Sequence, residues 1–263
     1  MALSLTDFRN KPPATIDWII PNFLTRQNTG FVIGPPKKAC KSWLLLGMAW
    51  DLSEGNIIWE IPELKPVKPL RTVYFTQEDT EEDADIRIKA HFTANRADNN
   101  RLWIVPKNLA IKLDASEGRR IVERELDGVA EKAGAIDLVM FDPMRRIHNG
   151  NENDSETIAK IWDVLDRIHR RYGCSVIVSH HITKPPREKE GYDPTDAFNG
   201  RGSGDIYGGG DAFVVVVPGM MSPDKTWRKV GVHFESKRAQ EMEARQLKVH
   251  FGTGRIENIG KIG

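Results

Sequence analysis

Short apolar runs alternate with longer segments of helical pattern along most of the chain, and this alternation constrains the fold most strongly. It predicts an α/β fold whose mostly parallel sheet is flanked by helices. The chain has 263 residues, of which 40% are hydrophobic, enough for one large domain. We therefore predict a single domain over residues 1–263, with residues 1–16 as an N-terminal extension. The predicted strands are residues 29–33, 71–76, 102–105, 136–141 and 175–179, and the predicted helices are residues 42–52, 116–132 and 156–172.

The C-terminal part follows a different pattern. Residues 212–217, 229–235 and 246–251 are separated by turn signals instead of helices, which predicts a β-meander. The polar loop before it, residues 180–206, is longer than a simple connection requires.

Composition excludes several classes of protein. No apolar run approaches the ~20 residues of a membrane-spanning helix, and the first residues lack the apolar core of a signal peptide. We therefore expect a cytoplasmic protein without membrane association. The net charge of +1 argues against a nucleic-acid binder that is basic over its whole surface. Two cysteines, Cys40 and Cys174, form neither a disulfide framework nor a zinc set.

The segment GPPKKACKS follows the first long predicted strand and opens the next helix. A loop in this place binds phosphates when backbone N–H groups surround them, a lysine reaches the β- and γ-phosphates, and a hydroxyl binds Mg²⁺. Lys41 and Ser42 supply the last two groups. The segment is one residue longer than G-x-x-x-x-G-K-[ST], Cys40 replaces the glycine before the lysine, and its two prolines lack N–H donors. The alternative is a basic loop with Ser42 as a helix cap. The predicted nucleotide contacts are Gly34, Lys38, Ala39, Cys40, Lys41, Ser42 and Trp43.

Carboxylates follow two of the predicted strands. Open α/β sheets keep their sites at the carboxyl ends of parallel strands. Asp142 stands where a Walker-B carboxylate would hold Mg²⁺ together with Ser42; alternatively, it makes a turn before a proline. Glu78 and Asp79 stand where a general base would polarise the attacking water, and we choose Glu78. The alternative, an acidic first helical turn, suits the carboxylates at 81–83 better.

The segments GPPKKACKSW, TQED, FDPMRRIHNGNENDS, VSHHITK and GRGSGDIYGGGDAF resemble the RepA-like branch of RecA-fold ATPases, relatives of the DnaB-type hexameric helicases. The resemblance covers nearly the whole chain. It implies a RecA-like P-loop NTPase core, ATP hydrolysis between the subunits of a ring, and DNA in the central hole. By position, Lys41 and Ser42 match the phosphate-loop pair, Glu78 the catalytic carboxylate, Asp142 the Walker-B aspartate and His180 the polar sensor. The altered phosphate loop departs from the family pattern and bears on the rate of hydrolysis.

Basic residues in two loops are candidates for DNA contact. Arg145 and Arg146 precede a polar run, whose alternative reading is a solvated loop with Asp154 or Ser155 capping the next helix. Mobile basic loops can follow a nucleic-acid backbone without reading its sequence. The alternative for the long loop is a surface segment whose charge is diluted by acidic residues. Its basic candidates are Lys184, Arg187, Lys189 and Arg201, and Tyr192 and Phe198 are candidates for base stacking.

Lys237 and Arg238 end a predicted strand of the meander. In a DnaB-like arrangement, such a pair reaches the γ-phosphate of the neighbouring subunit in trans; the alternative is a charged hairpin turn. His180 and His181 lack a third ligand nearby, so a sensor role fits His180 better than metal binding.

These features together predict an ATP-hydrolysing, ring-forming motor that acts on single-stranded DNA. We expect ATP and Mg²⁺ at its site, a hexameric homo-oligomer, and a role as a replicative helicase of a plasmid or phage. The alternative is a RecA-type DNA-binding ATPase that uses nucleotide as a switch in recombination or loading. A phosphotransferase is a weaker third reading, because it would have no use for Glu78 or for the pair Lys237 and Arg238.

Overall fold

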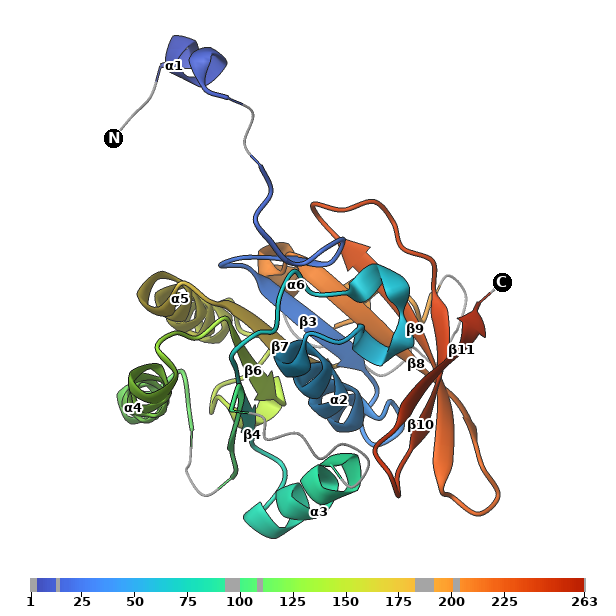
Figure 1. Ribbon diagram of the computed structural model, residues 1–263. Coiled ribbons are helices and arrows are strands. Elements are labelled where there is room, and N and C mark those ends of the chain that lie inside the picture. Colours follow the sequence, from blue (N-terminus) through green and yellow to red (C-terminus); the bar gives the residue numbers. More distant parts are fainter. Residues whose placement is uncertain are drawn as a thin grey trace.

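The computed structural model describes residues 4–12, 15–92, 100–107, 111–182, 192–200 and 204–262. Within these residues, a nine-stranded sheet has the strand order β11-β10-β9-β8-β3-β7-β6-β4-β5 (Figure 1). Strands β5, β4, β6, β7, β3 and β8 are parallel, and β9, β10 and β11 continue the sheet in antiparallel fashion. The parallel strands are β3 (Thr29–Gly34), β4 (Thr72–Thr76), β5 (Leu102–Val105), β6 (Leu138–Asp142), β7 (Ser175–His181) and β8 (Ala212–Met221). The antiparallel strands are β9 (Trp227–Ser236), β10 (Arg245–His250) and β11 (Ile256–Lys261).

Helices cover both faces of the sheet and form two hydrophobic cores. On one face, α2 (Lys41–Glu54) packs against the sheet and is buried on nearly all sides, which explains its almost continuous run of apolar residues. On the other face lie α4 (Ser116–Ala133) and α5 (Ser155–Tyr172), which bury a single apolar stripe each. The remaining helices are α1 (Leu5–Asn10), α3 (Glu81–Phe92) and α6 (Gly204–Gly209), with short 3₁₀ turns at Ile58–Glu60, Pro62–Leu64, Met144–Arg146 and Ala197–Asn199. The predicted α/β class, with its flanked parallel sheet and C-terminal antiparallel strands, is confirmed.

Several elements differ from the sequence prediction. The C-terminal meander has a further strand, β11, and a two-stranded sheet, β1 (Trp18–Ile20) with β2 (Leu24–Thr25), precedes β3. Helix α2 continues to Glu54 because Gly55, with φ 74°, adopts the left-handed conformation that terminates helices. The stretch predicted as a loop from residue 180 is shorter, because β7 extends to His181 and α6 begins at Gly204. Asp154 caps α5 by accepting from the Thr157 amide at 3.0 Å.

The N-terminal helix α1 extends away from the rest of the molecule (Figure 1) and buries none of its residues. In the described part of the chain, no helix combines the length and apolar character needed to cross a membrane.

Candidate nucleotide site

The parallel strands bring the predicted site residues to one edge of the sheet. Gly34 at the end of β3 pairs with His181 at the end of β7, and Thr76 at the end of β4 pairs with Asp142 at the end of β6. Side chains that are far apart in the sequence therefore meet where open α/β sheets place their ligands.

The loop between β3 and α2 requires glycine at its first position. A Cβ atom on Gly34 would lie 2.8 Å from the Ala39 Cβ and 2.9 Å from the Val216 carbonyl oxygen. Cys40, directly before α2, has φ 54° and ψ 25°. This left-handed conformation suits glycine and costs another residue free energy, which explains why phosphate loops have glycine there. The loop thus takes a phosphate-loop path despite Cys40.

The amine of Lys41 lies inside this loop. Its Nζ donates to the carbonyl oxygens of Gly34 at 2.9 Å and Pro35 at 3.2 Å. Lys41 is only 7% exposed, and this burial lowers its pKa to about 8, while the negative charges of Asp142 and Glu78 oppose the shift. The Lys41 amine therefore contacts carbonyl acceptors and feels the negative charge of the two predicted carboxylates.

His181 completes the surroundings of Lys41. Its Nδ1 lies 3.1 Å from the Lys41 Nζ, and burial followed by the Lys41 charge lowers its pKa to about 4. The ring is neutral at pH 7 and accepts from the ammonium group. The sensor role of His180 stays a prediction; its neighbour His181 makes the contact with Lys41, because successive side chains of a strand point to opposite faces. Strand alternation could have flagged this contact, although it does not say which face the loop occupies.

Asp142 is buried and held by two hydroxyl groups. The Tyr74 hydroxyl donates to its Oδ2 at 2.9 Å, and the Ser179 hydroxyl donates to its Oδ1. Burial raises the pKa of Tyr74 far above its usual range, so this hydroxyl stays a donor. Such second partners fix the orientation of a metal-binding carboxylate. Neither hydroxyl was identified from the sequence, because both lie on other strands.

The neighbours Glu78 and Asp79 have different environments. The Asp79 carboxylate accepts from Arg87 Nη1 at 2.5 Å, and its pKa is raised by burial, against the effect of Arg87. The Glu78 side chain is 46% exposed and lies 4.0 Å from Arg146. Asp79 is thus bound to α3, whereas Glu78 remains accessible at the site and contributes to the field around Lys41.

The residues present fit a nucleotide with Mg²⁺. The Thr76 hydroxyl oxygen, at the end of the strand that pairs with Asp142, is buried without a hydrogen-bond partner in the described residues. Hydroxyl and carboxylate oxygens are the ligands Mg²⁺ prefers, so Ser42 and Asp142 would hold it. When bound, Mg²⁺ would neutralise charge on the phosphates.

The basic DNA-contact candidates are only partly described. Arg145 and Arg146 are exposed in the turn after β6, at the same edge as Glu78. Lys112 donates to the Arg146 carbonyl at 2.7 Å, and its pKa is lowered by burial and then by the Arg145 charge. The long-loop candidates Lys184, Arg187, Lys189 and Arg201 lie outside the described residues.

The basic pair after β9 lies far from the loop of its own subunit. Ala212 pairs with both Gly30 and Ser236, so Lys237 lies beyond the level of Gly30. Gly30 is four residues, or about 13 Å along β3, from Gly34 at the phosphate loop. The Lys237 Nζ donates to the Gly208 carbonyl at 2.7 Å, and Arg238 is exposed. The structure does not bring this pair to the nucleotide site in cis.

Asp211 connects β3 to the turn after β9 at the end of the sheet opposite the phosphate loop. Its amide donates to the Thr29 carbonyl at 2.8 Å, and its own carbonyl accepts from the Lys237 amide at 2.9 Å. Asp211 therefore links β3 and the turn after β9, a structural role that the sequence did not reveal.

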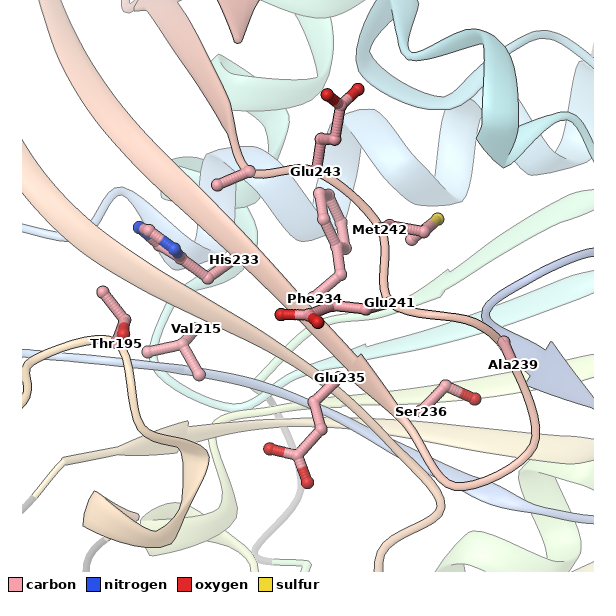
Figure 2. Close-up of a pocket in the computed structure, with 11 residues that line it drawn as sticks. Thr195, Val215, His233, Phe234, Glu235, Ser236, Ala239, Glu241, Met242 and Glu243 are labelled. Carbon is pink, nitrogen blue, oxygen red and sulfur yellow. The ribbon is translucent and has the colours of Figure 1, made fainter. Parts of the chain in front are cut away.

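A large cavity of about 630 Å³ also lies beside this turn and away from the phosphate loop. Figure 2 shows Glu235, Glu241 and Glu243 around it, with Phe234 and Met242. Its acidic lining is unsuited to phosphates, so the loop at Lys41 is the better candidate for the nucleotide site in spite of the cavity's size.

A family model described as an AAA domain matches residues 1–187. The matched region is more than half of the chain and contains Gly34, Lys41, Ser42, Glu78, Asp142 and His181. It ends before β8 and the antiparallel strands. The chain belongs to the AAA domain family, and it is a nucleotide-binding protein of the P-loop ATPase class.

Proposed function

We propose that this protein is an ATP-hydrolysing, ring-forming, RecA-like motor that acts on single-stranded DNA, of the RepA-like and DnaB-related branch. Its role would be that of a replicative helicase of a plasmid or phage. The loop at Lys41 would hold ATP, Asp142 and Ser42 would hold its Mg²⁺, and Glu78 would activate the attacking water.

The position of Arg238 is the observation that carries the ring assignment. Phosphoryl transfer needs a cation on the γ-phosphate, and Arg238 is exposed at the opposite end of the sheet from its own phosphate loop. We infer that this guanidinium acts on the nucleotide of a neighbouring subunit. In a ring, each site combines Lys41 of one subunit with Arg238 of the next.

The turn with Arg145 and Arg146 supports contact with a nucleic-acid backbone. Both guanidinium groups are exposed, and Arg146 lies 4.0 Å from Glu78. Because phosphates of DNA would attract these arginines, binding of DNA would change the surroundings of the general base. This arrangement provides a route by which DNA stimulates hydrolysis.

The second candidate is a nucleotide switch with little unwinding activity. The observation that favours it is the resting arrangement of Lys41, whose amine is already bound by two carbonyls and by His181. Lys41 must give up these contacts before it binds the phosphates, and the free energy that this costs opposes rapid turnover. Unwinding of a forked duplex separates the two functions, because only the motor separates the strands.

A mixed-subunit experiment tests the shared site. Arg238→Ala and Lys41→Ala subunits should each be inactive alone, since the first lacks the trans cation and the second lacks the phosphate-binding lysine. Mixed before assembly, they should regain part of the ATP turnover, because some interfaces pair an intact loop with an intact Arg238. Full activity of Arg238→Ala alone, or no recovery in a mixture shown by mass to contain both subunits, would refute the trans assignment.

A further inference from the structure

The hairpin formed by β8 and β9 lies against the phosphate loop at two points. Val216 on β8 approaches Gly34 so closely that no Cβ would fit there. Arg228 at the start of β9 donates from Nη1 to the Lys38 carbonyl oxygen at 3.1 Å. Both residues follow the region that matches the AAA domain, so this part of the chain adds a support to the loop that the family match does not include.

The charge of Arg228 acts at the end of the loop, on the residue directly before α2. Although burial raises the pKa of the Cys40 thiol to about 11, Arg228 is the strongest charge that opposes this rise, ahead of Lys41. The Arg228 Nε is buried and has no hydrogen-bond partner in the described residues. The Arg228 guanidinium therefore lies near Cys40, and its Nε donor is still available.

The bond to Lys38 also determines the orientation of a peptide group. In a trans peptide, the carbonyl and the following N–H point in opposite directions. Because Arg228 holds the Lys38 carbonyl towards β9, the Ala39 N–H points away from β9.

This orientation matters because the loop has few donors. Pro35 and Pro36 carry no N–H, and the Lys38 N–H already donates a hydrogen bond to the Pro36 carbonyl at 2.7 Å. The remaining donors for phosphates are the amides of Lys37, Ala39 and Cys40 and those of the first turn of α2, where helix amides lack backbone partners. The Ala39 amide is the one whose orientation the Arg228 contact determines.

We propose that Arg228 is a positioning residue of the nucleotide site that acts within its own subunit. It holds the Lys38–Ala39 peptide so that the Ala39 amide faces the bound phosphates, and its charge increases the affinity of the loop for them. The inference rests on the nucleotide binding that the proposed function requires. Its effect extends to diphosphates and triphosphates alike, because it concerns the loop and not the γ-phosphate, which Arg238 of a neighbour would contact.

The test measures the affinity of the full chain for Mg-ADP and Mg-ATP, together with the melting temperature without nucleotide. Losing one charge-assisted contact weakens binding by ~10-fold to ~100-fold. Arg228→Ala should weaken both nucleotides by a similar factor, raise KM and leave kcat nearly unchanged. Arg228→Gln keeps a donor for the Lys38 carbonyl without the charge and should lie between wild type and Arg228→Ala. Arg255→Ala, which removes an arginine from the turn between β10 and β11, should bind both nucleotides normally.

The outcomes separate this inference from the proposed function. If Arg228→Ala and Arg228→Gln fold and bind ADP within twofold of wild type, the role of Arg228 is wrong, while loss of binding in Lys41→Ala still supports the nucleotide site. Should Arg228→Ala melt early, Arg228→Gln decides: normal ADP affinity in that variant overturns the inference. A wild-type protein that binds neither nucleotide would overturn both.

Discussion

Replacing Glu78 by glutamine is expected to slow ATP hydrolysis by ~10²–10⁴-fold while Mg-ATP still binds. The amide of glutamine occupies nearly the same space but cannot accept a proton from the attacking water. Because the Glu78 side chain is 46% exposed, the substitution leaves the buried core untouched. Single-turnover hydrolysis and equilibrium binding of ATP, measured on the same preparation, separate the loss of chemistry from a loss of affinity.

Asp79→Asn is the matched control. Asp79 is bound to Arg87 at 2.5 Å, so its substitution should weaken the packing of α3. We expect a lower melting temperature and only a small change in kcat. If Asp79→Asn caused the large loss in kcat while Glu78→Gln hydrolysed ATP normally, the general base would be Asp79.

Lys41→Ala should weaken the binding of ATP and ADP on the order of 10²-fold and remove turnover, while the protein stays folded. A lysine in this position makes charge-assisted hydrogen bonds to the phosphates. Its amine contacts loop carbonyls and His181 instead of the hydrophobic core, so its removal spares the fold. Titration with a fluorescent ADP, together with circular dichroism, measures both quantities. Wild-type affinity in a folded Lys41→Ala protein would contradict the phosphate-loop assignment.

The pH dependence provides a second test of Lys41. Its pKa is lowered to about 8 without ligand, and binding to phosphates favours the charged amine. Nucleotide affinity should therefore be constant below pH 8 and fall above it by up to ~10-fold per pH unit. The stability of the unliganded protein should change with pH in the opposite direction. The pKa of Lys41 in the folded state lies below the unfolded value of 10.5, so the free energy of unfolding should rise as the pH increases from 8. Lys41→Arg, which stays charged, should lack the decline in affinity.

The sequence was informative where local pattern determines structure. The apolar runs that became β3, β4, β6 and β7 carry their own strand signal, and the position of a carboxylate at or just after the end of such a run places it at the sheet edge. Asp142 and Glu78 could therefore be located near Lys41 from the sequence alone. The extent of α2 was underestimated because a helix buried on all sides shows no amphipathic stripe to follow.

The partners of these residues could not be predicted, because they depend on contacts between distant parts of the chain. Tyr74 and Ser179 reach Asp142 only through the order of the strands, and Arg228 reaches Lys38 only because β9 folds back beside β8. The contact of His181 with Lys41 depends on which face of β7 borders the loop. Each of these facts is set by topology, which periodicity does not encode.

The most direct test of the motor assignment is ATP turnover per subunit, measured over a range of protein concentrations with and without single-stranded DNA. Because Arg238 lies far from the phosphate loop of its own subunit, turnover should rise with concentration until assembly is complete, and single-stranded DNA should increase it further. A stable monomer that hydrolyses ATP at a rate independent of both concentration and DNA would contradict the shared site and the proposed function together.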